Sequence, residues 1–262
     1  METLLIYTDD LSNKFWKINV LGNTFTITYG KIGTSGAVKT KKFESEEECQ
    51  KESASLIKSK MKKGYKFSQS SQLIVKESSM TEALFWELLK KAKTKGEYAD
   101  EQIEWLISHL SRKSIKDIVK FDYIFNTHYK KSYTSSLWAA AYIILGGCSD
   151  DSFDYFRAWV LYLGKKEYET AIKNPEALLP YLQDLNEYDD IPQLEELISV
   201  ASTAYEEKTG LDDESYFDIY SQLTNDHYDH PEIDLDWDED DEETLSKMFP
   251  LLWNAFGETP LE

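Results

Sequence analysis

The hydrophobic period of this chain changes near residue 45, and that change constrains the fold more than any other feature. Before it, short runs rich in β-branched and aromatic residues are separated by Gly, Asn, Asp or Ser; they cover residues 3–9, 14–22, 24–30 and 37–43. Such runs predict a meander of antiparallel strands joined by tight turns. Beyond residue 45 the apolar residues follow helical spacing. The sequence therefore predicts an α+β fold, with a small sheet first and helices after it.

The first predicted helix begins after Ser45, which forms a capping box with Glu48. Cys49 lies on the apolar stripe of this helix and is predicted to be a small core residue. Gly64 supplies the end of the helix. The lysines at residues 58–63 suit the negative end of the helix dipole, so no ligand is needed to explain them.

Helical spacing resumes after residue 78 and continues to residue 256. Amphipathic runs are predicted at residues 78–93, 100–111, 114–131, 136–146, 150–163, 175–184, 192–208 and 240–256. We therefore expect an antiparallel sheet-plus-helix domain over residues 1–76 and a mainly helical domain over residues 77–262. Residues 68–72 are the best linker candidate, although residues 73–77 after them read as a further strand. The side chains expected in the helical core are those of Trp86, Trp138, Phe153, Phe156 and Trp159.

The two predicted domains carry opposite charge. Residues 1–76 hold 13 Lys and 8 Asp or Glu, a net charge of +5, whereas residues 77–262 hold 16 basic and 40 acidic residues, a net charge of −24. Charge asymmetry of this kind bears on partners rather than on fold. We expect the first domain to attract DNA or another polyanion, and the second to attract a basic protein.

Other classes of function find little support in the sequence. There is no secretory signal and no apolar run long enough to span a bilayer, and Cys49 and Cys148 do not make a disulfide framework. A cytoplasmic protein with no membrane partner, no cofactor and no metal is expected. The acidic segment of residues 225–243 departs from a calcium loop at the positions that require Gly and Glu. Its His227 and His230 suit weak divalent binding, but a solvated, partly mobile acidic loop is the favoured interpretation.

Lysines gather on the predicted strands of residues 23–43. Tyr29 and Lys31 lie two residues apart, so their side chains emerge on one face of a strand, as do those of Lys39 and Lys41 on the next strand. An aromatic ring among ammonium groups suits phosphate binding and base stacking. The alternative is a solvated sheet face whose lysines prevent edge-to-edge aggregation.

Three stretches carry a resemblance to a known module: "FWKINVLGNTFTITYGKIGTSG", "KTKKFESEEEC" and "KKGY". With them, the first 66 residues resemble a WGR domain, found in DNA-dependent poly(ADP-ribose) polymerases and in bacterial proteins of the MolR type. The family's Trp-Gly-Arg triplet stands here as Tyr29, Gly30 and Lys31, followed by Gly33 and Gly36 in a turn. The resemblance implies nucleic-acid contact through this triplet. Because lysine lacks the planar fork of arginine, backbone-directed and salt-sensitive binding without sequence readout is expected.

A second resemblance rests on "LWAAAYIILGGCSDDSFDYFRAWVLYLGKKEYETAIKNPEALLPYL", with support from "FWELL", "AYEEKTG" and "DWDEDDEETL". From about residue 80 to 256 the chain resembles a bacterial family known as domain of unknown function number 4240. This resemblance implies no particular activity.

The helical region offers one stretch with the side chains of an active site. In "GGCSDD", Cys148, Ser149, Asp150 and Asp151 stand at a predicted helix start, and His128 can be imagined as a base for the thiol. Helix capping explains the same residues, because Gly146 and Gly147 end one helix and Ser149 or Asp150 begins the next. No phosphate loop, dinucleotide fingerprint, Gly-x-Ser-x-Gly or His-Glu-x-x-His is present.

The leading hypothesis is therefore a non-catalytic, two-module bacterial protein. Its first domain binds nucleic acid through Tyr29, Gly30, Lys31, Lys39 and Lys41, and its second binds a further partner. One alternative is a protein-interaction adaptor that never touches nucleic acid. Another is an enzyme with a site near Cys148 to Asp151.

Overall fold

The structure, a computed structural model, describes residues 2–9, 12–34, 36–68, 78–187, 190–224, 226 and 233–261. The chain divides into two compact units. Unit 1 comprises Met1–Thr81, Ser108–Phe121 and Ser202–His227, and unit 2 comprises Glu82–Ile107, Asp122–Ala201 and Tyr228–Glu262. The domain boundary predicted at residues 76 and 77 lies outside the described residues, as do all but residue 68 of the predicted linker and the alternative strand at 73–77.

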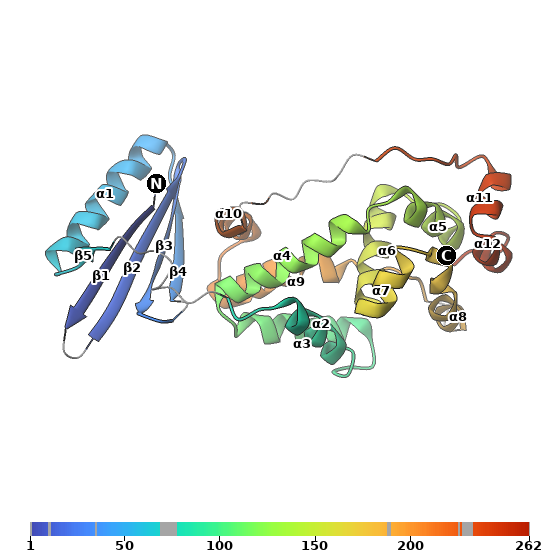
Figure 1. Cartoon of the computed structure of the whole chain (residues 1–262), viewed down its shortest axis with the longest axis horizontal. Helices are drawn as coiled ribbons and strands as arrows, with labels where there is room; N and C mark the ends of the chain where they lie inside the picture. The colour runs from blue at the N-terminus through green and yellow to red at the C-terminus, as the bar shows by residue number, and fades with distance from the viewer. Residues whose placement is uncertain are drawn as a thin grey trace. The chain divides into compact units, whose positions relative to one another are not determined.

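The N-terminal region is a five-stranded antiparallel sheet (Figure 1). Its strands are β1 (Glu2–Asp9), β2 (Ser12–Leu21), β3 (Thr24–Lys31), β4 (Ala37–Lys42) and β5 (Lys66–Phe67), in the order β4-β3-β2-β1-β5. The four strands predicted from alternation are confirmed. The short β5 follows directly on the first helix and pairs with Leu5 and Ile6 of β1.

Helix α1 (Glu46–Lys62) covers one face of this sheet (Figure 1). The Ser45 side chain accepts a hydrogen bond from the Glu48 amide at 3.2 Å, as the capping box predicts. Cys49 is buried in the core between helix and sheet, which confirms its predicted role. The other buried members of this core are Leu5, Trp16, Ile18, Val20 and Phe25.

Every regular element described from residue 82 onward is a helix. They are α2 (Glu82–Ala92), α3 (Ala99–Ser111), α4 (Ile115–Lys131), α5 (Ser135–Leu145), α6 (Asp150–Leu163), α7 (Lys165–Ala171), the 3-10 helix η1 (Pro175–Leu178), α8 (Leu179–Glu187), α9 (Glu196–Thr209), α10 (Asp213–Thr224), α11 (Glu242–Met248) and α12 (Pro250–Phe256). No helix among the described residues combines the length and the apolar character needed to cross a membrane.

The predicted helical core is confirmed, two helices were not predicted, and one predicted helix is divided in the structure. The five aromatic side chains named above, from Trp86 to Trp159, are all buried. Neither α7 nor α10 stands out from periodicity, because α7 is only 7 residues long and both helices are rich in charged or polar residues. The single run predicted at 240–256 divides into α11 and α12 at Pro250, since proline lacks the N–H that a continuous helix would use.

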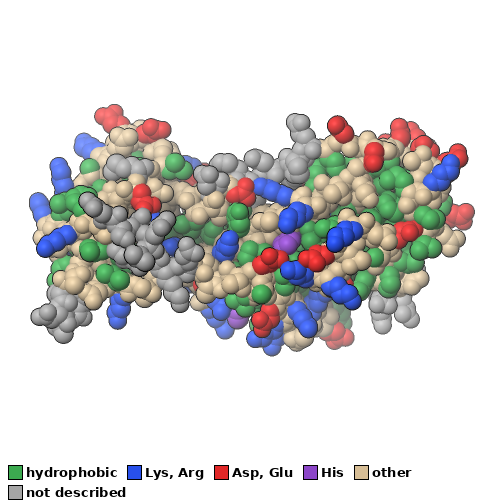
Figure 2. Space-filling view, in the orientation of Figure 1, with side chains coloured by type: hydrophobic (Ala, Val, Ile, Leu, Met, Phe, Trp, Pro, Cys, Tyr) green, Lys and Arg blue, Asp and Glu red, His purple; other side chains and the backbone are tan. Residues whose placement is uncertain are grey.

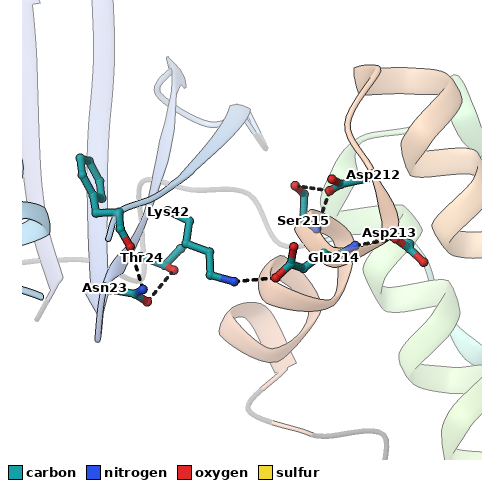
Figure 3. A network of polar contacts seen from close by, with 8 residues as sticks. Asn23, Thr24, Lys42, Asp212, Asp213, Glu214 and Ser215 are labelled. Atoms are coloured by element: carbon teal, nitrogen blue, oxygen red, sulfur yellow. Dashed lines mark hydrogen bonds and ion pairs between the residues drawn. The ribbon is translucent and has the colours of Figure 1, made fainter. Parts of the chain in front are cut away.

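On the second face of the sheet, strand β3 presents three threonines. Thr24, Thr26 and Thr28 of β3 are all buried. The Thr26 hydroxyl is hydrogen-bonded to Gln222 of α10, and Lys42 of β4 donates to Glu214 of the same helix at 2.7 Å (Figure 3). Unit 1 therefore combines the sheet with residues of α10, nearly 200 positions later in the chain.

Candidate nucleic-acid interface

A two-residue turn determines which lysines meet on the sheet. Gly22 and Asn23 connect β2 to β3, with Leu21 opposite Thr24, and Gly22 has the positive φ of 55° that glycine tolerates. This register places Lys14 opposite Lys31. Directly opposed side chains share a face of the sheet, with Cβ atoms about 5 Å apart. The third residue of the Tyr-Gly-Lys triplet is thus paired with a second ammonium group.

The end of α1 adds further positive charge at this end of the sheet. Lys60 lies over the rings of Trp16 and Tyr65, with its Nζ 5.6 and 5.0 Å from the two centroids. Burial lowers the pKa of Lys60, and repulsion from Lys63 and Lys14 lowers it further. The ammonium groups are therefore close enough to repel one another, and a bound anion would relieve this repulsion.

We call this set the basic-aromatic cluster. It consists of Lys14, Lys31, Lys60 and Lys63 with the rings of Trp16, Tyr29 and Tyr65. Tyr29 lies opposite Trp16 and packs against the core beneath α1. Figure 2 shows lysine side chains in blue over α1 and the neighbouring strands. The chemistry available here is that of phosphate binding beside aromatic surface.

Lys39 and Lys41, the other two lysines expected at the interface, lie apart from this cluster. Lys39 lies opposite Ile27 and Lys41 opposite Phe25, so both share the face of Lys31 but not its end of β3. At about 3.4 Å per residue, the six steps along β3 from position 25 to position 31 separate Lys41 from Lys31 by about 20 Å. Lys41 instead lies 3.9 Å from Glu52 and 4.6 Å from the centroid of Phe43.

The three residues of the triplet lie in different environments. Tyr29 is only half-exposed, because part of its ring packs into the core. Gly30 is required by a close approach: a Cβ there would lie 3.0 Å from both the Gly36 Cα and the Thr34 Oγ1. Gly30 therefore allows the β3–β4 turn to close, and Lys31 is the exposed member of the triplet.

Sequence reasoning missed Lys14, Lys60 and Lys63. The position of Lys14 could have been found from the Gly-Asn turn, because a two-residue hairpin loop determines which residues of the two strands lie opposite each other. In the sequence, the helix dipole already explains why lysines occur at the end of α1, so nothing there points to a binding role. Their approach to Trp16 depends on how α1 packs on the sheet, which no local pattern reports.

Lys42 lies on the opposite face and is engaged by the chain itself. Its Nζ donates to Glu214 at 2.7 Å (Figure 3). This hydrogen bond, followed by the charges of Glu214, Asp218 and Asp212, raises the pKa of Lys42. Here an acidic helix already neutralises part of the positive charge of the sheet.

Among the residues considered for an enzyme site, Ser149 is the N-cap of α6, and Asp150 and Asp151 lie in the first turn of that helix. Gly146 ends α5 with a φ of 65°, and the Ser149 hydroxyl accepts a hydrogen bond from the Ser152 amide at 3.2 Å to begin α6. Burial, followed by the nearby charges of Asp150 and Asp154, raises the pKa of Cys148 to about 12. A thiol so rarely ionised is a poor nucleophile.

His128 lies in a different environment from Cys148. Its Nε2 is 3.4 Å from Glu82, and its ring packs against Phe85, Trp86 and Tyr168. Burial lowers the pKa of His128. No hydrogen bond or ion pair among the described residues joins it to Cys148. His227 and His230, the weak metal ligands considered above, lie outside the described residues.

Comparison with known proteins finds the same two modules. The family model described as WGR domain matches residues 1–72, and the one described as Protein of unknown function (DUF4240) matches residues 80–207. The Escherichia coli (strain K12) protein YfeS, described as uncharacterized, is 49% identical over 65 residues, which are 25% of this chain and 27% of YfeS. Protein YehF of the same organism is 40% identical over 60 residues, which are 23% of this chain and 22% of YehF.

The matched regions are therefore a small part of these relatives, since this chain spans only 27% and 22% of their lengths. A crystal structure of a Bacteroides fragilis protein shares 30% sequence identity, with a TM-score of 0.26, over 37% of this chain and 30% of its own. Residues 1–72 thus match the WGR family model, and residues 80–207 match the DUF4240 family model.

Proposed function

We propose that the WGR domain binds DNA, at strand ends or along the backbone, through the basic-aromatic cluster. The observation that carries this proposal is the pairing of Lys31 with Lys14 beside Lys60, whose pKa is lowered by burial and by the neighbouring ammonium groups. Positive charge held together in this way binds phosphate and releases counterions. The partly exposed ring of Tyr29 supplies aromatic surface at the same place, above the buried Trp16.

We further propose that the helical region binds a basic protein partner, which makes the whole chain a non-catalytic adaptor. The net charge of −24 over residues 77–262 supports this second role, since opposite charge speeds and orients association. The competing function is an adaptor that binds no nucleic acid. The ion pair between Lys42 and Glu214 favours it, because a charged sheet residue is already occupied from within the chain.

The test compares two double variants of the full chain by fluorescence anisotropy with a short blunt-ended duplex. K31E/K60E changes the cluster, and K39E/K41E makes the same change of charge elsewhere on the same face. We expect K31E/K60E to weaken binding more and to reduce the salt slope by about two, one for each phosphate that the variant no longer binds. Equal weakening in both variants would mean that DNA binding depends on the net charge of the chain and not on the cluster. Phosphate binding is strong at about 50 mM salt, so a wild-type chain that binds no duplex there would favour the adaptor that binds no nucleic acid.

A circular duplex of the same sequence distinguishes ends from backbone. If the bound group is a strand end, the circle competes poorly with the linear duplex. If the cluster contacts only the backbone, the circle and the linear duplex compete equally well at the same concentration of base pairs.

A further inference from the structure

A groove lies in unit 2 between helix α5 and the segment after residue 232. Its volume is about 340 Å³. The walls are formed chiefly by Trp138 and Tyr142 of α5, Cys148, and Trp237, Asp238 and Glu239 of the later segment. The volume is within the range of ligand sites in proteins. Half of this groove belongs to the DUF4240 match and half lies beyond it.

Hydrogen bonds hold the aromatic walls in place. The Trp237 Nε1 donates to the Ser135 carbonyl at 3.0 Å, and the amide of Asp236 donates to the Ser135 hydroxyl at 3.1 Å. The Trp138 Nε1 donates to the Cys148 carbonyl at 3.1 Å. Both indole N–H groups are therefore satisfied within the chain. Trp138 is itself buried and stacked on Phe153, so the partly exposed rings of Tyr142 and Trp237, rather than polar edges, are what the walls offer to a ligand.

Negative charge stands beside these rings. Asp238 and Glu239 are exposed and line the groove, and Tyr142 lies 5.3 Å from Trp237 between ring centroids. Burial raises the pKa of Tyr142, and the charges of Glu239, Asp240 and Asp238 raise it further. The carboxylates thus act on the same ring that lines the groove. An anion entering here would be repelled.

Aromatic faces and carboxylates together select an organic cation. The electron-rich faces of Trp and Tyr attract ammonium and guanidinium groups, and Trp does so best. A guanidinium group can also lie flat on an indole while donating hydrogen bonds to a carboxylate. A neutral apolar ligand would use the rings but leave the carboxylates without a partner.

We propose that this groove binds an arginine or lysine side chain of a basic protein segment. The charge of the region argues for a protein segment rather than a free small cation, because a net −24 attracts an extended basic surface and not only one group. This inference rests on the partner-binding role proposed for the helical region. It is independent of DNA binding, since none of the groove residues belongs to the WGR domain.

The experiment follows the indole N–H resonances of the full chain by two-dimensional NMR. The probe is a short peptide of alternating arginine and glycine, and its matched control carries citrulline, the neutral isostere of arginine. We expect the arginine peptide to shift the resonances of Trp138 and Trp237, assigned by single Trp→Phe variants, in a saturable manner. The citrulline peptide should leave them unchanged.

Two pairs of variants test the origin of the effect. D238N/E239Q removes both carboxylates of the groove without changing side-chain shape. It should weaken peptide binding by about threefold to thirtyfold, because two exposed ion pairs of about 0.3–1 kcal/mol each are lost. E206Q/E207Q neutralises two exposed carboxylates of α9 and should leave the affinity within about twofold. The dispersion of the spectrum reports whether each variant is folded.

Several results would overturn the proposal. Equal shifts with the citrulline peptide would mean that the groove does not select for positive charge. The absence of any shift at millimolar peptide would exclude binding. If E206Q/E207Q weakened peptide binding as much as D238N/E239Q, the effect would be long-range attraction by the net charge and not a contact in the groove. Equal affinity for free guanidinium ion and the peptide would assign the groove to a small cation. Failure of DNA binding would leave all these results unchanged, so the two proposals are tested separately.

Discussion

At the scale of single residues, Asp117 illustrates how one carboxylate joins distant parts of unit 1. Its Oδ1 accepts hydrogen bonds of 2.7 Å from both the Ser78 hydroxyl and the Ser79 amide, and its Oδ2 accepts one of 2.8 Å from the Ser114 hydroxyl. Burial alone would raise the pKa of Asp117, but these hydrogen bonds outweigh it, and the pKa is lowered. The ionised form is thus the one that the fold stabilises.

This lowered pKa gives a pH-dependent prediction. A carboxyl whose pKa is lower in the folded state stabilises the fold above its unfolded pKa of about 4, and this stabilisation is lost as the pH falls through the folded value. D117N should therefore lower the free energy of unfolding at pH 7 by about 1.5–3 kcal/mol, as for hydrogen bonds to a charged group. The variant should also flatten the loss of stability below about pH 4. Urea unfolding across the acid range up to neutral pH measures both, with E104Q on exposed Glu104 as the control. Parallel pH profiles for D117N and the wild type would contradict this account.

A second prediction at this scale concerns Cys148. With a pKa of about 12, roughly one thiol in 10⁴ is ionised at pH 8. Alkylation by iodoacetamide should therefore be slower than that of free cysteine by about a thousandfold, since the thiolate is the reactive form. Mass spectrometry after timed quenching measures the rate, and C148S identifies the modified site. Alkylation as fast as that of free cysteine would reopen the enzyme hypothesis.

At the scale of elements, the β3–β4 turn depends on two glycines for different reasons. Gly36 has a φ of 75°, and a Cβ there would lie 2.6 Å from the Phe15 ring and 2.9 Å from the Tyr29 carbonyl. Gly33 has a φ of 84° but meets nothing within 4 Å. One position thus combines backbone strain with a clash, whereas the other has the strain alone.

We therefore expect G33A to lower the free energy of unfolding by about 1 kcal/mol, from the left-handed backbone. G36A should cost roughly 1–3 kcal/mol more, because Phe15 is fully buried and has no room to move. Thermal or urea unfolding followed by tryptophan fluorescence compares the two. Equal costs would show that the turn shifts to accommodate the new methyl group.

The elements themselves were largely predictable. The four strands, the capping box of α1 and the breaks at Gly146, Gly164 and Gly210 follow from local rules of alternation, capping and positive φ. Helix α10 shows the limit of such rules. Its residues Tyr216, Ile219 and Tyr220 are buried, but the remainder of the helix is largely polar. The helix is therefore stabilised by contact with the sheet and does not show strong periodicity in the sequence.

At the scale of the whole molecule, the opposite charges of the two regions lead to a prediction about DNA binding. The carboxylates of α10 act on Lys42 and reduce the positive field of the sheet. E214Q/D218N should therefore strengthen DNA binding at about 50 mM salt by about twofold to fivefold, the range expected for exposed charges. The gain should fade at high salt, where the Debye length shortens.

The control for this variant is E206Q/E207Q, which makes the same change of net charge on α9. Anisotropy titrations from about 50 to 300 mM salt compare the two with the wild type. Deletion of residues 225–243, the densest acidic segment, should also strengthen binding at low salt if that segment faces the sheet. Unchanged affinity in all three variants would mean that the acidic region serves only another partner.

By itself, the sequence determined the succession of strands and helices and the position of the caps and breaks, because each of these depends on neighbours within a few residues. It also determined the opposite charges of the two regions, which follow from composition alone. Only the tertiary structure decided which lysines meet. Register places Lys31 with Lys14 and away from Lys41, and the packing of α1 brings Lys60 to Trp16. The groove between Trp138 and Trp237 has the same origin, since contacts across about 100 residues leave no periodic trace in the chain.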